Sequence, residues 1–386
     1  MIQKIKLFFF EWKELGRFNK LPKEQKKIVF YAESAADWPH LGPVIEHLTN
    51  TLNQEVCYLT SDFNDPLLKK NKKNILSFYV GSGSVRTTLF RTIDAKVFAM
   101  TLPDLETYHL KRSVHPVHYV YLFHSINSTH MVYREKAFDA YDTVLCVGKH
   151  HVDEIRQTEK VYNLKPKKLV EHGYARLDSI LKEFKTRPKF TPSKERGKKI
   201  LMAPSWGECS LIENDFGIEL IEELLSAGHD LTLRLHPMTV RHHPALVSEL
   251  QQRFKKYKSF FVETNMSEQD SLHQSDLMVS DWSGAAFEYA FGLERPVLFV
   301  DTPRKVNNPN YQKVAMPPLE ASVRTEIGDV LQLDEFNQVG EKVAKLCSDY
   351  EGFKEQLRSS RKKWIYNEGK SASVGANAIY ELINNQ

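Results

Sequence analysis

The sequence is poor in cysteine and lacks the features that mark several large classes of protein. Its four cysteines, Cys57, Cys146, Cys209 and Cys347, form no C-x-x-C pair and have no zinc-ligand spacing. This scatter fits reduced thiols and argues against disulfides and structural zinc. No stretch is long and apolar enough to span a membrane, and no small-residue cleavage site follows an apolar N-terminal core. We therefore expect a cytoplasmic protein that is not exported.

An excess of charge of one sign is also missing. The 53 Lys and Arg residues nearly balance 49 acidic residues, and the formal net charge of +4 is too small to indicate a nucleic-acid partner. The chain has no G-x-x-x-x-G-K-[ST] and no G-x-G-x-x-G after a first strand, which removes the ATPase and dehydrogenase classes. It also has no Asp-x-Asp pair. Any diphosphate is then expected to be neutralised by protein donors and helix ends, with no metal and no cofactor.

Short apolar runs alternate with helical stretches in two series along the chain. The first series places strands at 28–31, 55–60, 75–80, 96–100, 118–123 and 143–147, with a helix at 41–52. The second places strands at 199–203, 231–235, 260–262, 277–280 and 296–300, with a helix at 217–227. Continuous apolar strands separated by helices predict parallel sheets covered on both faces. We expect an α/β protein of two Rossmann-like doubly wound domains facing across a cleft, where ligands bind.

A polar stretch rich in Lys, Arg and Pro separates the two series and predicts a solvated linker. The expected organisation is a basic amphipathic segment at 1–25, a first domain at 26–180, a linker at 181–198, a second domain at 199–335 and C-terminal helices at 336–386. The last basic amphipathic stretch, 353–366, is expected to pack back across the cleft.

Residues 4–18 interleave aromatic residues with cations. This pattern is typical of an interfacial helix that lies on an anionic bilayer. The alternative is that Leu7, Phe8, Phe9 and Trp12 pack on the body of the protein itself, as a terminal helix commonly does. Contact with a membrane surface and internal packing both remain open.

The turn after the predicted strand 277–280 favours an anion. Small hydroxyl residues and a glycine precede a compact helix, whose first amide groups and macrodipole attract phosphate. Ser280, Asp281, Ser283 and Gly284 are the residues of this turn. The alternative is that Asp281 or Ser283 only caps the helix.

Two histidines follow predicted strands at the expected cleft. His236 ends the strand 231–235, and Pro237 turns the chain away after it. His236 could donate hydrogen bonds to a diphosphate and stabilise a leaving group, although an isolated His-Pro can also be a simple turn. His124 follows the aromatic strand 119–123 in the first domain, where a neutral imidazole could accept the proton of an attacking hydroxyl. A core or loop role for His124 is the alternative.

Three further polar or aromatic positions lie at strand ends or next to the linker. Ser205 and Trp206 follow the first strand of the second domain, where Ser205 could bind phosphate and Trp206 could stack on a base or belong to the core. Arg176, just before the linker, could pair with anions or form an interdomain salt bridge.

The order of these motifs resembles the CDP-glycerol poly(glycerophosphate) glycerophosphotransferase family of teichoic-acid primases and polymerases. The likeness comprises a histidine after an aromatic strand, Ala203-Pro-Ser-Trp206, Arg234-x-His-Pro237 and Ser280-Asp-Trp-Ser283 with its acidic helix, followed by Arg295-Pro-Val297. It runs from about Tyr119 to Val300. The chain departs from the family at Phe123 and Ser125, where tryptophan and glycine are usual, and at Ala175, where proline is usual.

The resemblance implies a GT-B fold with the acceptor on the first domain and the nucleotide donor on the second. It implies that His124 is the catalytic base and that His236 contacts the diphosphate. It also implies a donor or phosphate-binding role for Ser205, Arg234, Ser280, Asp281, Ser283 and Gly284, and contact of Glu288 with the ribose.

The implied activity is metal-independent transfer of glycerol phosphate, or a similar polyol phosphate, from a CDP-activated donor to a glycan or lipid-linked glycan hydroxyl, releasing CMP. This would serve teichoic acid or other cell-surface polysaccharide synthesis, with the enzyme peripheral at the inner face of the membrane. A GT-B nucleotide-sugar glycosyltransferase or related epimerase is the alternative, since fold alone does not fix function. A non-catalytic member that binds polymer or a partner enzyme is a third hypothesis.

Overall fold

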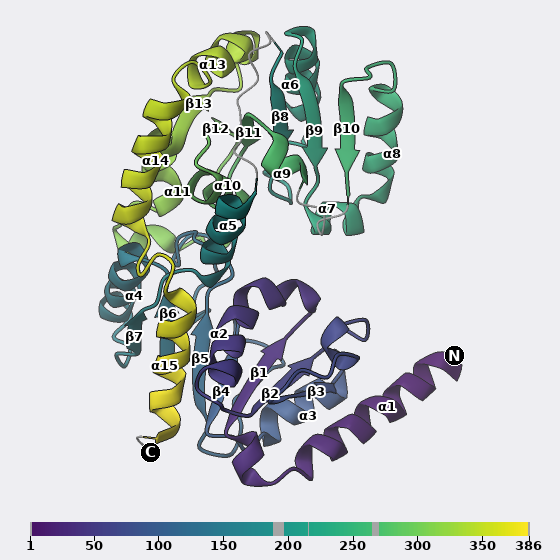
Figure 1. The fold of residues 1–386 in the computed structure, drawn as a ribbon, viewed down its shortest axis with the longest axis vertical. Coiled ribbons are helices and arrows are strands. Elements are labelled where there is room, and N and C mark those ends of the chain that lie inside the picture. The colour runs from purple at the N-terminus through teal and green to yellow at the C-terminus, as the bar shows by residue number, and fades with distance from the viewer. Residues whose placement is uncertain (1, 188–196, 215, 265–269, 385–386) are drawn as a thin grey trace. The chain divides into compact units, whose positions relative to one another are not determined.

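The computed structural model describes residues 2–187, 197–214, 216–264 and 270–384. The chain divides into two compact units (Figure 1). The N-terminal unit comprises Met1–Asp178, Asn307–Met316 and Trp364–Gln386, and the C-terminal unit comprises Ser179–Val306 and Pro317–Lys363. Each unit is built around one parallel sheet.

The sheet of the N-terminal unit has seven strands in the order β3-β2-β1-β4-β5-β6-β7, and every pairing is parallel. Its strands are β1 (Ile28–Ala32), β2 (Val56–Thr60), β3 (Ile75–Tyr79), β4 (Val97–Met100), β5 (His118–Leu122), β6 (Thr143–Cys146) and β7 (Lys168–Glu171). The order reverses between β1 and β4, which creates a switch point at the carboxyl edge of the sheet, where ligands of such folds bind.

Helices cover both faces of this sheet, because alternate residues of a strand point to opposite sides. Phe30 of β1 belongs to a core cluster with residues of two helices, α2 (Trp38–Asn50) and α15 (Ser371–Asn384). Its neighbour Tyr31 packs edge-on against Phe90 of α3 (Ser84–Thr92). Figure 1 shows α2 and α15 side by side, so the end of the chain completes the N-terminal core.

Three further helices begin in the N-terminal unit: α1 (Ile2–Asn19), α4 (Lys149–Val161) and α5 (Ala175–Thr186). Helix α1 contacts β3 and α3 and buries Leu15 and Phe18 near its C-terminal end. Helix α5 starts in the N-terminal unit and continues into the C-terminal unit.

The sheet of the C-terminal unit has six parallel strands in the order β10-β9-β8-β11-β12-β13. Its strands are β8 (Lys199–Met202), β9 (Asp230–Arg234), β10 (Phe260–Glu263), β11 (Leu277–Ser280), β12 (Val297–Val300) and β13 (Gly328–Leu331). Its helices are α6 (Phe216–Ser226), α7 (Pro237–His242), α8 (Pro244–Arg253), α9 (Asp270–Gln274), α10 (Ala285–Leu293), α11 (Leu319–Ser322), α12 (Arg324–Ile327), α13 (Val339–Leu346) and α14 (Tyr350–Trp364). The order again reverses once, here between β8 and β11.

The structure confirms an α/β protein with two doubly wound sheets, and every strand predicted from the sequence is present. The edge strands β7 and β13 were not predicted. Helix α5 extends to Thr186, so the first residues of the predicted linker are helical, whereas 188–196 lie outside the described residues. The predicted domain boundaries and the packing of 353–366 across a cleft stay predictions.

All four cysteines are free thiols, and Cys57 and Cys146 are buried. Among the described residues, no helix combines the length and apolar character that crossing a membrane requires.

Candidate functional site

His124 stands at the carboxyl end of β5, and its side chain is exposed. Its Nδ1 lies 3.2 Å from the carbonyl oxygen of Thr101, the residue that follows β4. Because a carbonyl oxygen can only accept, the hydrogen of the neutral ring is on Nδ1 and the lone pair is on Nε2. In this tautomer Nε2 can take a proton from a substrate.

The position of Thr101 is in turn fixed by Asp37, which the sequence analysis did not single out. The hydroxyl of Thr101 donates to Asp37 Oδ1 at 3.1 Å, and the other oxygen of Asp37 accepts from the backbone N–H groups of Glu33 at 2.7 Å and Ser34 at 3.2 Å. Asp37 therefore joins the loop after β1 to the residue that orients His124. The two loops flank the switch point of the first sheet.

A second histidine, His40 in the first turn of α2, lies beside His124. The two ring centroids are 6.2 Å apart, and the ring of Tyr174 lies 5.7 Å from that of His40. The hydroxyl of Tyr174 donates to the carbonyl oxygen of His124 at 2.9 Å. Burial, reinforced by the neighbouring His124 and Arg176, holds the pKa of His40 well below its usual value, so the ring is neutral. Arg176 itself is half-buried in the first turn of α5.

The switch point of the second sheet is organised by the buried carboxylate of Asp281. It accepts from the backbone N–H of Ser205 at 2.7 Å, the hydroxyl of Ser205 at 3.0 Å and the backbone N–H of Leu211 at 3.0 Å. Burial raises the pKa of Asp281, an effect that these hydrogen bonds oppose. Ser280 is also buried and donates to the carbonyl oxygen of Ala203 at 2.7 Å. The side chains of Ser205, Ser280 and Asp281 therefore hold the loop after β8 to the loop after β11.

Ser283, Gly284 and Glu288 lie at the start of α10 and are only half-buried. Gly284 is the N-cap, and the carbonyl oxygens of Ser283 and Gly284 accept from the N–H groups of the first helical turn. Glu288 lies in that turn. Of the predicted phosphate-binding turn, Ser283 and Gly284 are thus the part that reaches the surface.

His236 caps the short helix α7. Its Nδ1 accepts from the backbone N–H of Met238 at 3.1 Å, so the hydrogen of its neutral ring is on Nε2. The ring stacks on Trp206 with centroids 6.0 Å apart. Burial and the nearby Lys305 lower the pKa of His236 to about 4. At neutral pH His236 is therefore an uncharged hydrogen-bond donor through Nε2.

Three cations lie near the two tryptophans of this switch point: Arg304 and Lys305 of the loop after β12, and Arg324 at the start of α12. Lys305 Nζ lies 4.3 Å from the ring centroid of Trp206 and donates to its carbonyl oxygen at 2.7 Å. The guanidinium of Arg304 lies 5.8 Å from the ring of Trp282, and that of Arg324 lies 3.4 Å from the same ring. None of these cations was predicted from the sequence, although the basic pair Arg304-Lys305 in the loop after a predicted strand was a usable signal.

Arg234, at the end of β9, is buried in an ion pair with Glu263 at 3.1 Å, and Ser271 Oγ bridges the two side chains. Its guanidinium is therefore engaged inside the C-terminal unit.

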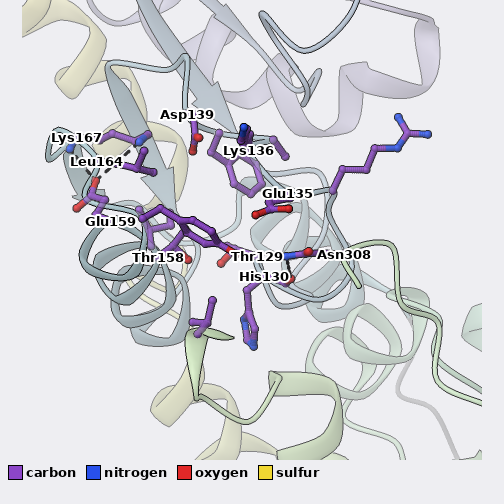
Figure 2. Close-up of a pocket in the computed structure, with 16 residues that line it drawn as sticks. Thr129, His130, Glu135, Lys136, Asp139, Thr158, Glu159, Leu164, Lys167 and Asn308 are labelled. Atoms are coloured by element: carbon purple, nitrogen blue, oxygen red, sulfur yellow. Dashed lines mark hydrogen bonds and ion pairs between the residues drawn. The ribbon is translucent and has the colours of Figure 1, made fainter. Parts of the chain in front are cut away.

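A cavity of about 300 Å³ occupies another part of the N-terminal unit, between the loop after β5, α4 and the segment 308–314 (Figure 2). Its polar lining includes Thr129, Glu135, Asp139 and Lys167, and none of the predicted site residues lines it. Within the described part of the chain, no group of His, Cys, Asp and Glu side chains has the arrangement of a metal site.

Two doubly wound parallel sheets, each with candidate site residues at its switch point, define an α/β protein of the GT-B class. The model of the CDP-glycerol:poly(glycerophosphate) glycerophosphotransferase family matches residues 120–310, which include both histidines and the start of α10. Residues 120–310 therefore carry the sequence features of this family.

A relative of known name is the teichoic acid glycerol-phosphate primase of Bacillus subtilis, which is 27% identical over 169 residues. The match covers 43% of this chain and 41% of the primase, so less than half of the relative's length is compared.

Solved structures resemble the whole chain. The wall teichoic acid polymerase TagF, in a variant soaked with CDPG, matches with a TM-score of 0.56 and 15% identity, covering 100% of this chain and 96% of that one. A putative UDP-N-acetylglucosamine 2-epimerase from Listeria monocytogenes matches with a TM-score of 0.60 and 11% identity, covering 94% and 97%. At these identities the likeness shows the fold.

Proposed function

We propose that this chain transfers glycerol phosphate, or a similar polyol phosphate, from a CDP-activated donor to a hydroxyl of a cell-surface glycan or its lipid-linked precursor. The acceptor oxygen attacks the β-phosphorus and forms a new phosphodiester bond. The bond from the β-phosphorus to the bridging oxygen breaks, and CMP leaves with that oxygen.

His124 is the proposed base. Its Nδ1–H is directed to Thr101, so its Nε2 lone pair can accept the proton of the attacking hydroxyl. The N-terminal unit would thus hold the acceptor. The Asp37 hydrogen bonds to Thr101 and to the loop after β1 keep this tautomer and orientation in place.

The C-terminal unit is the proposed donor side. His236 presents Nε2–H, which suits a developing negative charge on the leaving phosphate. Ser283 and Gly284 at the start of α10 would meet the diphosphate, and the partly exposed side chain of Trp206 would contact the base. Glu288 is proposed to contact the ribose. Ser205, Ser280, Asp281 and Arg234 would support these groups from behind, and Arg176 would contribute positive charge on the acceptor side.

This proposal depends above all on the different tautomers of His124 and His236, which both lie within the residues that match the family. The hydrogen of the neutral ring is on Nδ1 in His124 and on Nε2 in His236. One presents a lone pair and the other presents a hydrogen, as a base and a leaving-group stabiliser require.

Incubation of the purified protein with CDP-glycerol and a polyol-phosphate or glycan acceptor should release CMP. The same protein should melt at a higher temperature with CMP or CDP than with UDP. Stabilisation by UDP alone, with no CMP released, would instead favour a nucleotide-sugar glycosyltransferase or epimerase. Binding without turnover across a panel of activated donors would favour a non-catalytic member.

We also propose that α1 contacts the inner face of the cell membrane. Leu15 and Phe18 anchor the helix to the N-terminal unit, whereas Phe8, Phe9 and Trp12 are 44%, 67% and 40% exposed. These three side chains form the aromatic patch, and the exposed Lys6 and Lys13 lie on the same helix. Exposed aromatic residues interleaved with lysines suit an anionic lipid surface.

Sedimentation with phosphatidylglycerol vesicles tests this contact. Replacing the three residues of the aromatic patch with serine should abolish co-sedimentation, and the control Phe261→Ser, at a 64% exposed site of the C-terminal unit, should leave it unchanged. Equal binding by the patch variant and the native protein would refute the membrane contact.

A further inference from the structure

His40 has a buried nitrogen that nothing in the described part of the chain satisfies. Its Nδ1 is enclosed by protein and has no hydrogen-bond partner. Buried N–H groups without a partner are rarer in native structures than buried acceptors without one, so an imidazole more readily leaves its unprotonated nitrogen without a partner. The hydrogen of the neutral ring therefore resides on Nε2, which is absent from the buried atoms without a partner.

The surroundings of His40 keep it uncharged. A second proton would have to enter at the enclosed Nδ1, and the positive charge it adds would be opposed by the neighbouring His124 and Arg176. The ring also lies against Tyr174, which holds the backbone of His124 through its hydroxyl. His40 and His124 are thus fixed in one cluster of the N-terminal unit, with complementary hydrogen-bonding capacity at their Nε2 atoms.

We propose that His40 is a second acceptor-binding residue, which donates a hydrogen bond from Nε2 to the same substrate hydroxyl that His124 deprotonates. This inference rests on the proposed function. An attacking hydroxyl has one hydrogen to give to His124 and two lone pairs, of which one attacks phosphorus and the other can accept from His40. A hydrogen bond of about 2.9 Å from each ring places the shared oxygen about 4 Å from both centroids, which the 6.2 Å separation of the rings permits.

A neutral donor suits this position better than a cation. An imidazolium here would disfavour the protonation of His124 that the reaction requires, since like charges oppose each other over this distance. A neutral Nε2–H orients the oxygen without this penalty. We expect its loss to affect the acceptor and not the nucleotide donor.

Two amide replacements distinguish the nitrogen involved. His40→Gln places a donor near the Nε2 position, and His40→Asn places one near Nδ1. Compared with the native protein, His40→Ala should lower kcat/KM for the acceptor roughly 100-fold with KM for the CDP donor unchanged. His40→Gln should recover at least about a tenth of the native value, and His40→Asn should not. His47→Ala, a control near the other end of α2, should behave as the native protein.

A native rate in His40→Ala, equal recovery by His40→Asn, or a defect in donor KM would overturn the inference. Melting temperatures within about 2 °C of the native protein show that a variant is folded.

A nitrogen NMR measurement on the histidine rings is independent of the activity. With the signals of His40 assigned by their loss in His40→Gln, the ring should remain in the neutral Nε2–H form through the pH range in which an ordinary histidine takes up its proton. A hydrogen on Nδ1, or titration near pH 6.5, would refute the role assigned to His40 even if CDP-glycerol were not the donor. Failure of the native protein to release CMP, with this tautomer observed, would count against the proposed function alone.

Discussion

His124 and His236 are the same residue type at the same kind of place, just after a strand of a parallel sheet, yet their rings carry the hydrogen on different nitrogens. A carbonyl oxygen faces Nδ1 of His124, and a backbone N–H faces Nδ1 of His236. The partner of one nitrogen decides what the other can offer to a substrate. The sequence motif places the imidazole, and the neighbouring backbone sets its chemistry.

The polar residues around the two histidines differ as well. On the first sheet, Asp37 acts indirectly through Thr101 and leaves His124 exposed. On the second, Ser205, Ser280 and Asp281 bond to one another or to the backbone, and the accessible groups are His236, Trp206 and the start of α10. The second edge is therefore a rigid scaffold with a few presented groups.

The largest expected effect is at His124. His124→Ala should lower CMP release roughly 1000-fold, because the base is lost. His124→Gln should be no better, since an amide has hydrogen-bonding groups but no basic lone pair. Steady-state assays of both variants check this, with circular dichroism to confirm folding. A near-native rate in His124→Gln would show that the ring only positions the acceptor.

Asp281→Ala should destabilise the protein by about 3 kcal/mol, because two buried N–H groups and a hydroxyl lose their acceptor. Ser283→Ala, close by in the same turn, should change stability by less than about 0.5 kcal/mol and weaken donor binding instead. Urea unfolding monitored by fluorescence measures the first effect, and donor KM measures the second. A stable Asp281→Ala with weak donor binding would make Asp281 a direct ligand.

His236→Ala should lower turnover roughly 100-fold, because one hydrogen-bond donor to the leaving phosphate is removed. Here, unlike at His124, the glutamine variant should regain activity, about tenfold over alanine, since its amide retains an N–H donor. Failure of His236→Gln to exceed His236→Ala under saturating donor would contradict the assignment of His236 as a donor.

The smallest expected effect is on the pH dependence of the protein's stability. The folded pKa of about 4 for His236 lies below the usual 6.5, so the unfolded chain binds the proton more readily. The contribution of neutral His236 is complete above pH 6.5 and is lost as the pH falls from 6.5 towards 4. His236→Asn keeps a side-chain cap but does not titrate. Between pH 7 and 5 the native protein should lose a few degrees of melting temperature relative to this variant, and parallel curves would contradict the lowered pKa of His236.

Much of the fold follows from the sequence, because buried parallel strands are continuous apolar runs. Strand β11 was predicted with its observed bounds. The strands that precede His124 and His236, β5 and β9, were predicted to within one residue at each end. The edge strands β7 and β13 escaped prediction because Lys168–Glu171 and Gly328–Leu331 are short and half-exposed, without an apolar run. Whether a strand lies at the edge depends on the order of strands in the whole sheet, and the local pattern of apolar residues does not reveal that order.

The site was predictable as a set of positions and less so as a set of contacts. A serine or aspartate after a strand can face a ligand or a neighbouring loop, and only the fold shows that Asp281 faces Ser205. His40 was missed because it lies eight residues beyond β1, in a helix, where the pattern gives no sign of its approach to His124.

The central claim is tested most directly by phosphorus NMR of CDP-glycerol incubated with the protein and an acceptor. The account predicts that the diphosphate signals are replaced in equal amounts by CMP and by a new phosphodiester on the acceptor, and that His124→Ala prevents the change. Persistence of the diphosphate with the native protein, or equal conversion by His124→Ala, would contradict it.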